Sequence, residues 1–279
     1  MVSSDFRAKA REKLTGKWGK AAIMMLCYFA YILIIEYISG HTTGFLAFAI
    51  SIAAVVINVP VVYGVSMAFL KLYNDEEVGY FDFFTLGFEN FSRAWSVVWN
   101  IFLKILVPFI LFIVSYVIIF VGIGATSSSN SFGALSALGV ILLIVSTIWL
   151  VLESFYYELA QYIAIENANM TGKEVAEESK RLMTNRRWKL FCLQFSFIGW
   201  AILASLTFGI GMLWLTPYML FATLAFYKFT LGNKEEVVEK PVVEPTPEPV
   251  VEPTEEPAPE PVEDVIEEPT EEPTDNAGE

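Results

Sequence analysis

The stretch that decides the fold covers residues 171–227. It begins with the charged segment TGKEVAEESKRLMTNRRWK (171–189) and continues with two apolar runs, LFCLQFSFIGWAILASLTF (190–208) and MLWLTPYMLFATLAFY (212–227), separated only by GIG. The initial TGKE has the capping-box pattern, so a helix is expected to begin there. Spanning helices need about 20 apolar residues, and loops rich in Lys and Arg stay in the cytoplasm. The stretch therefore predicts a transmembrane hairpin whose open end is cytoplasmic.

The composition is that of a membrane protein with a separate acidic end. Of the 279 residues, 55% are hydrophobic, whereas soluble domains are about 45–50% apolar. The net charge of −13 arises mainly in residues 233–279, which contain 17 of the 31 acidic residues and 2 of the 18 basic ones. The rest of the chain is slightly basic, and its basic residues flank apolar runs. Nucleic acid is therefore not expected as a partner.

Residues 1–20 predict a basic helix before the first apolar run. They contain six basic side chains, and Phe6, Ala10, Leu14 and Trp18 recur every four residues, which predicts a modest apolar face. Two interpretations stay open. The helix lies on anionic lipid, or the segment is a plain positive flank that orients the first span. Both place the N-terminus in the cytoplasm.

Apolar runs throughout residues 21–232 predict a membrane domain with an all-α fold. Six spans are expected, at residues 21–39, 45–70, 97–121, 135–165, 190–208 and 212–227. The three loops then assigned to the outside contain no Lys or Arg. Because positive charge marks cytoplasmic loops, we expect a multi-pass protein of the plasma membrane with both termini in the cytoplasm. The lipid bilayer, with anionic lipids in particular, is the expected partner.

An aromatic row precedes the third span. Phe84, Phe88, Phe91 and Trp95 follow one another at intervals of 4, 3 and 4 residues, so they share one face of a continuous helix. Aromatic side chains are enriched at the headgroup level of bilayers. We interpret the segment as a cytoplasmic interfacial helix with these four residues as anchors. The alternative is an amphipathic segment packed on the bundle.

Three charged residues within the apolar runs are candidate functional groups: Lys104, Glu153 and Glu158. At 1.5 Å per residue, Lys104 and Glu158 lie at similar depths, about 10 Å from the inner ends of their spans. We expect them to pair, because pairing offsets the cost of charge in a bilayer; the alternative for Lys104 is snorkelling to the surface. Glu153 is placed deeper, so it is the residue best suited to transport chemistry.

Residues 233–279 form a low-complexity tail in which PVVEPT and EEPT are each repeated. Proline removes amide donors and glutamates repel one another, so the composition predicts a disordered cytoplasmic tail. Two roles are compatible with this composition: a solubilising entropic tail, which we favour, and a docking arm for a basic protein partner.

No pattern in the sequence indicates catalysis. The two cysteines lie apart in apolar runs, His41 is the single histidine, and P-loop, HExxH and GxSxG motifs are absent. We therefore expect no enzyme activity, no catalytic residues, no cofactor and no metal site. Two function classes remain. The first is a membrane scaffold or assembly factor, which we prefer; the second is a small transporter or channel subunit that uses Lys104, Glu153 and Glu158.

Three segments resemble a known family. They are FRAKAREKLTGKWGKAA (residues 6–22), ESKRLMTNRRWKLFCLQFSFIGW (178–200) and LTFGIGMLWLTPYMLFATLAFY (206–227). Together they resemble the uncharacterised bacterial integral membrane proteins of domain-of-unknown-function family 975, over roughly residues 5–230. The resemblance implies a multi-span membrane protein and carries over no activity, substrate or catalytic residue.

Overall fold

The computed structural model describes residues 2–125 and 133–239. Within these residues the chain is entirely helical, with eleven helices and no strand. Residues 1–239 form one compact unit. Most of the predicted tail, residues 240–279, lies outside the described residues.

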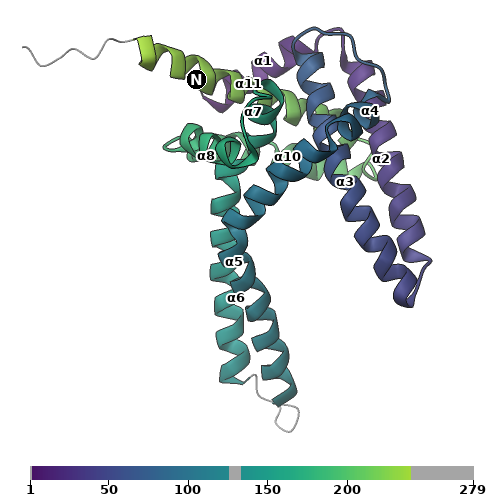
Figure 1. Ribbon diagram of the computed structural model, residues 1–279, viewed down its shortest axis with the longest axis vertical. Helices are drawn as coiled ribbons and strands as arrows, with labels where there is room; N and C mark the ends of the chain where they lie inside the picture. The colour runs from purple at the N-terminus through teal and green to yellow at the C-terminus, as the bar shows by residue number, and fades with distance from the viewer. Residues whose placement is uncertain (1, 126–132, 240–279) are drawn as a thin grey trace, which may run out of the picture. The chain divides into compact units, whose positions relative to one another are not determined.

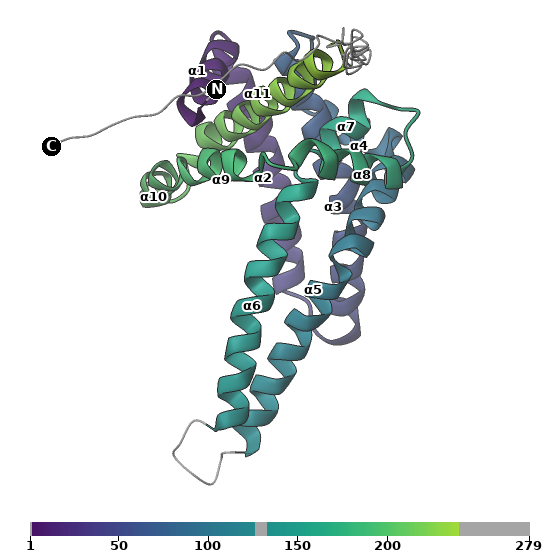
Figure 2. The ribbon, with the colours of Figure 1, turned by 90° about the vertical axis from the view of Figure 1, so that its left-hand side faces the viewer.

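Two long helical hairpins are the main elements of this unit (Figures 1 and 2). The first joins α2 (Trp18–Gly40) to α3 (Gly44–Tyr73), and the second joins α5 (Phe91–Ala125) to α6 (Ala134–Tyr157). Large apolar side chains are exposed along all four helices, and Phe45 of α3 is the extreme case at 85%. Apolar surface of this extent needs a bilayer or a partner to cover it, because water does not solvate it favourably.

The seven other helices gather at one end of the hairpins and are called the helical cap below (Figure 2). The cap comprises α1 (Ser3–Leu14), α4 (Asp82–Glu89), α7 (Ala160–Glu166), α8 (Gly172–Met183), α9 (Arg187–Phe195), α10 (Ile198–Leu206) and α11 (Met212–Glu239).

The predicted apolar row of α1 is confirmed, but it packs on protein. Phe6, Ala10 and Leu14 are fully buried, and α1 lies against α11. The Phe6 ring makes edge contacts with the rings of Phe226 and Phe229, each at a centroid distance of 5.4 Å. Because α11 occupies this face, the apolar side of α1 is not available to lipid.

Five helices in the described residues, instead of the expected six, are long and apolar enough to cross a membrane. They are Trp18–Gly40, Gly44–Tyr73, Phe91–Gly124, Ala134–Glu166 and Arg187–Leu206.

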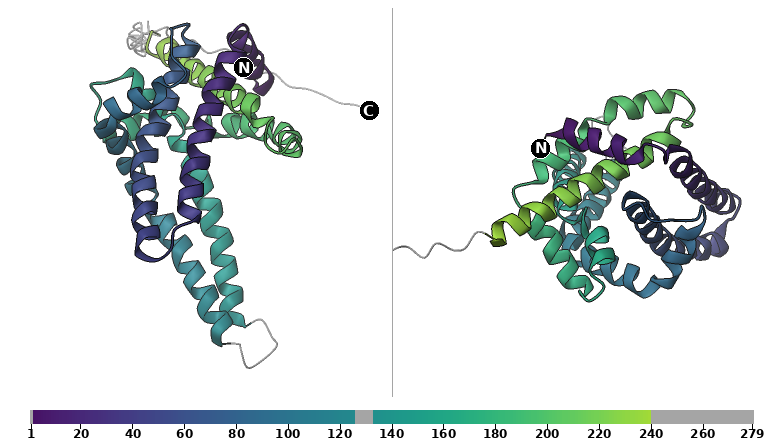
Figure 3. Two further views of the ribbon diagram at one scale, coloured as in Figure 1. Left: turned by 90° about the vertical axis from the view of Figure 1, so that its right-hand side faces the viewer. Right: turned by 90° about the horizontal axis from the view of Figure 1, so that it is seen from above.

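The sixth expected span corresponds to α11, which behaves as a core helix of the cap. Its side chains Phe221, Phe226 and Tyr227 are fully buried by protein. In the right-hand view of Figure 3, α11 is seen lengthwise while α2 and α3 are seen nearly end-on. A helix that is apolar all round suits the interior of a protein as well as a bilayer, so composition alone did not separate the two environments.

Two glycines allow α4 to contact α3 backbone to backbone. A Cβ atom on Gly64 would lie 1.9 Å from the carbonyl oxygen of Phe83, and one on Gly87 would lie 2.2 Å from that of Pro60. Real Cβ atoms do not approach other atoms so closely, so only glycine fits at either position. Small residues permit this kind of close approach between membrane helices.

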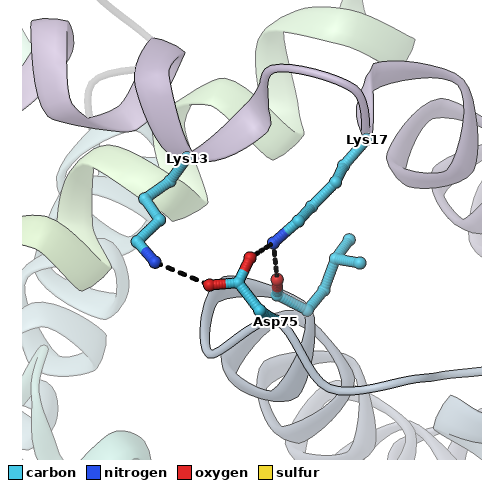
Figure 4. A network of polar contacts seen from close by, with 4 residues as sticks. Lys13, Lys17 and Asp75 are labelled. Atoms are coloured by element: carbon cyan, nitrogen blue, oxygen red, sulfur yellow. Dashed lines mark hydrogen bonds and ion pairs between the residues drawn. The ribbon is translucent and has the colours of Figure 1, made fainter.

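The turn after α3 is tied to the N-terminal segment through Asp75 (Figure 4). Lys13 Nζ donates to one carboxylate oxygen at 2.8 Å and Lys17 Nζ to the other at 2.5 Å. Lys17 also donates to the carbonyl oxygen of Leu72 at 2.6 Å, a group at the end of α3 that also accepts from the Asp75 amide at 3.3 Å. The hydrogen bonds from Lys13 and Lys17 lower the pKa of Asp75 to about 2.

This contact predicts a pH-dependent stability. Because the pKa of Asp75 is lowered from 3.8 to about 2 by folding, its contribution is present above about pH 4 and is lost as the pH falls toward 2. In detergent, the Tm difference between the wild type and Asp75→Asn should therefore become smaller as the pH is lowered from about 4 to about 2. Glu77→Gln is the control, because Glu77 lies in the same loop and has no ion-pair partner among the described residues. The Tm difference between the wild type and Glu77→Gln should not show this pH dependence. A constant difference for Asp75→Asn would contradict the prediction.

Candidate functional site

A polar pocket lies between the two hairpins and the cap. Its volume is about 350 Å³, and α3, α5, α6, α7 and α11 all contribute to it. The lining residues are Val62, Ser66, Ile101, Ile105, Ser154, Tyr157, Glu158, Gln161, Tyr162 and Leu220.

The pocket is organised around one carboxylate. Glu158 lines it and retains accessible surface, and Gln194 Nε2 of α9 donates to its Oε1 atom at 3.3 Å. Across the pocket, Ser66 Oγ donates to Gln161 Oε1 at 2.6 Å, which positions a hydroxyl and an amide between α3 and α7. Helices distant in the sequence therefore hold these polar groups in place.

The groups that line this pocket are suited to bind a small ligand. No cationic side chain is among the lining residues, so Glu158 is free to take up a proton or a small cation. Hydroxyl and amide groups nearby can complete the coordination or the hydrogen bonds. In the part of the chain that the structure describes, no three His, Cys, Asp or Glu side chains are grouped as metal ligands.

The expected pairing of Lys104 with Glu158 is wrong. Lys104 Nζ lies 3.7 Å from a carboxylate oxygen of Glu177 on α8. Counting residues placed Lys104 and Glu158 at similar depths, but it could not show that α8 folds back against α5 and α6. This packing brings the charged segment that precedes the fifth apolar run to the N-terminal part of the third.

Glu153 also has a partner on α8. Its carboxylate lies 3.6 Å from Lys180 Nζ, and it is not among the residues that line the polar pocket. Its expected depth assumed one straight helix to Ile165, whereas α6 ends at Tyr157 and α7 begins at Ala160. Of the three candidate charges, Glu158 is the one that lines the polar pocket, and the role of each stays a prediction.

The helix that supplies both partners begins where the sequence indicated. Thr171 is the N-cap of α8, its Oγ1 atom accepts from the Glu174 amide at 3.3 Å, and its own amide donates to Glu174 at 2.7 Å. These hydrogen bonds, with the one from the Thr171 backbone first, lower the pKa of Glu174. Gly172 then packs directly on the backbone of Ser96 in α5, where an added Cβ would lie 2.5 Å from the carbonyl oxygen. The capping box and this close contact together position Glu177 and Lys180.

The aromatic row does not lie on one helix, as the sequence had suggested. α4 ends at Glu89 and α5 begins at Phe91, so Phe84 and Phe88 are on one helix and Phe91 and Trp95 are on the next. Phe84 packs on the Tyr31 ring at 5.4 Å, and Trp95 Nε1 donates to the carbonyl oxygen of Val56 at 3.4 Å. Phe88 and Phe91 are exposed. α4 thus matches the packed-segment alternative, while anchoring by these residues at headgroup level stays a prediction.

Sequence reasoning missed Arg93, which holds α7 to α5. Its guanidinium donates to the carbonyl oxygens of Ala164 at 3.1 Å and Asn167 at 2.7 Å, and also to that of Met170. These carbonyls lie at and beyond the end of α7, where intrahelical donors run out. The sequence offered one indication of this contact: the last carbonyls of a short helix lack intrahelical donors. This shows that a donor is needed, but it does not identify Arg93 as the donor.

The corrected partner of Lys104 can be tested by double-mutant cycles. Side-chain exposure is 41% for Lys104 and 54% for Glu177, so the pair should behave as a surface ion pair with a coupling of about 0.5 kcal/mol. We expect this coupling between Lys104→Met and Glu177→Gln, and none between Lys104→Met and Glu158→Gln. Thermal unfolding in detergent at low salt measures both cycles. A larger coupling to Glu158 would restore the original pairing.

Comparison with known proteins gives the family and no activity. Among curated proteins and solved structures, no chain is similar enough to match. The family model described as "Protein of unknown function (DUF975)" matches residues 1–234, and the chain therefore belongs to this family.

Proposed function

We propose that the chain is a non-enzymatic membrane scaffold whose helical cap holds two transmembrane hairpins in a defined arrangement. The observation that carries the proposal is the pairing of charges in the apolar runs with the cap. Lys104 and Glu153 are both engaged by α8, through Glu177 and Lys180. Charges that serve a transport path need to exchange partners, whereas these two support packing between elements.

A second set of contacts ties the cap together on the same side. Glu166 of α7 accepts from Tyr227 at 2.9 Å and pairs with Lys228, both on α11. With Asp75 joining α3 to the N-terminal segment, the inner ends of both hairpins are linked through the cap. A linked cap with apolar helices projecting from it is suited to present those helices to other membrane proteins.

The proposal includes an even number of membrane crossings, with the cap in the cytoplasm and both termini there. Phe6 contacts Phe226 and Phe229, which supports a common side for the two ends of the membrane domain. The helix Arg187–Leu206 is then not a lone fifth crossing. It dips into the bilayer from the cap and returns without crossing, because α11, which follows it, packs in the cap against α1.

Cysteine labelling tests this topology. In a protein with Cys27 and Cys192 replaced by serine, Thr43→Cys should react with an impermeant thiol reagent added outside, and Glu77→Cys should not. Both positions are exposed turns, so access to the reagent depends on the side of the membrane. Protection of Ile210→Cys would support the turned-back hairpin, and its labelling from outside would establish six crossings and contradict the placement of α11 in the cap. Labelling of Glu77→Cys from outside would contradict the orientation.

The scaffold proposal is tested by isolating the protein in polymer-bounded membrane discs and measuring its mass on native gels. We expect a complex of fixed stoichiometry that Gly172→Val disrupts, because a Cβ atom at this position would lie 2.5 Å from the carbonyl oxygen of Ser96 and would displace α8 from α5. Lys173→Gln removes an exposed charge of α8 without an ion pair among the described residues, and it should leave the complex intact. A wild-type protein without any stoichiometric partner would contradict the proposal.

The second candidate is a small transporter, and the Glu158 pocket favours it. Proteoliposomes with an imposed proton or monovalent-cation gradient distinguish the two candidates. A scaffold should give no flux above that of empty liposomes. Flux that Glu158→Gln abolishes and Glu153→Gln preserves would replace the scaffold by a carrier centred on this pocket.

A further inference from the structure

A larger groove lies between α6 and α9, apart from the Glu158 pocket. Its volume is about 590 Å³. The lining residues are Thr147, Ile148, Val151, Leu152, Phe155, Asn185, Arg187, Trp188 and Phe191. No residue is shared with the polar pocket, so the groove needs its own explanation.

One wall of the groove is apolar and open. Ile148, Val151 and Leu152 lie on α6 within a candidate span, and each is about half exposed, at 55%, 47% and 52%. Aromatic rings form the opposite side. Trp188 stacks on Phe191 at 5.0 Å, and Phe191 meets Phe155 edge-on at 6.0 Å. Such a trough matches a flexible hydrocarbon chain, because all of its contacts are dispersive.

The end of the groove carries a fixed cation. The guanidinium carbon of Arg187 lies 4.0 Å from the centre of the Tyr156 ring, a cation–π distance that holds the side chain in place. One of its nitrogens reaches the Leu152 carbonyl only at 3.5 Å. No carboxylate among the described side chains lies within ion-pair distance of Arg187. Its remaining donors are therefore available to an anion.

The position of Arg187 fits the headgroup level. It is the first residue of the candidate span Arg187–Leu206, and the apolar wall belongs to the span Ala134–Glu166. The adjacent Arg186 and Lys189 add positive charge on the same helix end. Cations at the ends of spans meet lipid phosphates in this region.

We propose that the groove binds one phospholipid with an anionic headgroup. The phosphate is held by Arg187 and Asn185, and one acyl chain lies along Ile148, Val151 and Leu152. The guanidinium presents paired donors that match phosphate oxygens, and the local surplus of positive charge selects an anionic over a zwitterionic headgroup. The site is independent of the scaffold proposal, since either a scaffold or a carrier can hold such a lipid.

Native mass spectrometry with equal amounts of phosphatidylglycerol and phosphatidylcholine tests the site. We expect one phosphatidylglycerol to be retained preferentially, and Arg187→Gln to reduce its retention about tenfold, because a charge-assisted bidentate contact is lost. Lys173→Gln removes the same charge from the same cytoplasmic segment outside the groove. Its effect should stay within about twofold, as expected for a screened surface charge.

A second variant tests the apolar half without changing charge. Val151→Trp fills the trough and should also lower phosphatidylglycerol retention about tenfold, while Val145→Trp, at a lipid-exposed position of α6 outside the groove, should not. Equal losses for Arg187→Gln and Lys173→Gln would show only general attraction and overturn the proposal. Equal retention of the two lipids would also overturn the proposal. A dimer mass that Val151→Trp abolishes would overturn it as well, because the occupant of the groove would then be a second copy of the chain.

Discussion

Gly87→Val should destabilise the protein by about 3 kcal/mol or more, because overpacking against backbone cannot be relieved by a change of rotamer. A Cβ atom at this position would meet the carbonyl oxygen of Pro60 at 2.2 Å. The contact at Gly64 is closer still, because a Cβ atom there would lie 1.9 Å from the carbonyl oxygen of Phe83. A side chain at Gly87 can therefore be accommodated only if α4 separates from α3. The two half-buried cysteines, Cys27 and Cys192, allow thermal unfolding to be followed with a thiol-reactive dye.

Gly199→Val is the matched control for this substitution. Gly199 lies in a helix, and a Cβ atom there would meet nothing within 4 Å. Both changes carry a similar helix-propensity effect, so the difference between them reports the contact of α4 with α3. Equal shifts of the unfolding temperature would show that the close approach is absent in the membrane protein.

Arg93→Met should cost about 3 kcal/mol, because hydrogen bonds to a charged group contribute about 1.5–3 kcal/mol. The carbonyl oxygens of Ala164, Asn167 and Met170 all lose the guanidinium at once, although Asn167 keeps a hydrogen bond from the Met170 amide at 3.1 Å. Arg93→Lys should recover part of the loss, since one ammonium cannot reproduce the planar fork of a guanidinium. The same thermal assay measures both variants.

Arg181→Met is the control for loss of an arginine. Arg181 forms a two-point contact with Glu178 at 2.8 and 2.9 Å, but its side chain is 63% exposed. Its removal should cost less than about 1 kcal/mol, as for other surface ion pairs. If Arg93→Met were no more harmful than Arg181→Met, Arg93 would not hold α7 in place.

Local patterns were sufficient wherever the controlling interaction lies within one segment. The apolar runs predicted the helices of both long hairpins, and the TGKE pattern predicted the start of α8, because span length and N-terminal capping are properties of consecutive residues. The apolar row that recurs every four residues predicted which face of α1 is buried. The family resemblance over the same segments was confirmed by the match to residues 1–234.

Patterns failed where the answer depended on what lies opposite a segment. Residues 212–227 look alike whether lipid or protein surrounds them, and only packing against α1 shows that α11 is a core helix. The aromatic row presumed a continuous helix, but α4 ends at Glu89 and α5 begins at Phe91. Neither the packing of α11 nor the break between α4 and α5 can be recognised from the local sequence.

By itself, the sequence determined that this is an all-helical protein with membrane-length apolar helices, because burial of apolar side chains and backbone hydrogen bonding depend mainly on composition and spacing. Only the tertiary structure decided the partners of the charges. Lys104 meets Glu177, Glu153 meets Lys180, and Glu158 is left in a pocket. Ion pairs act over a few ångströms, and the fold of α8 back onto α5 and α6 sets those distances.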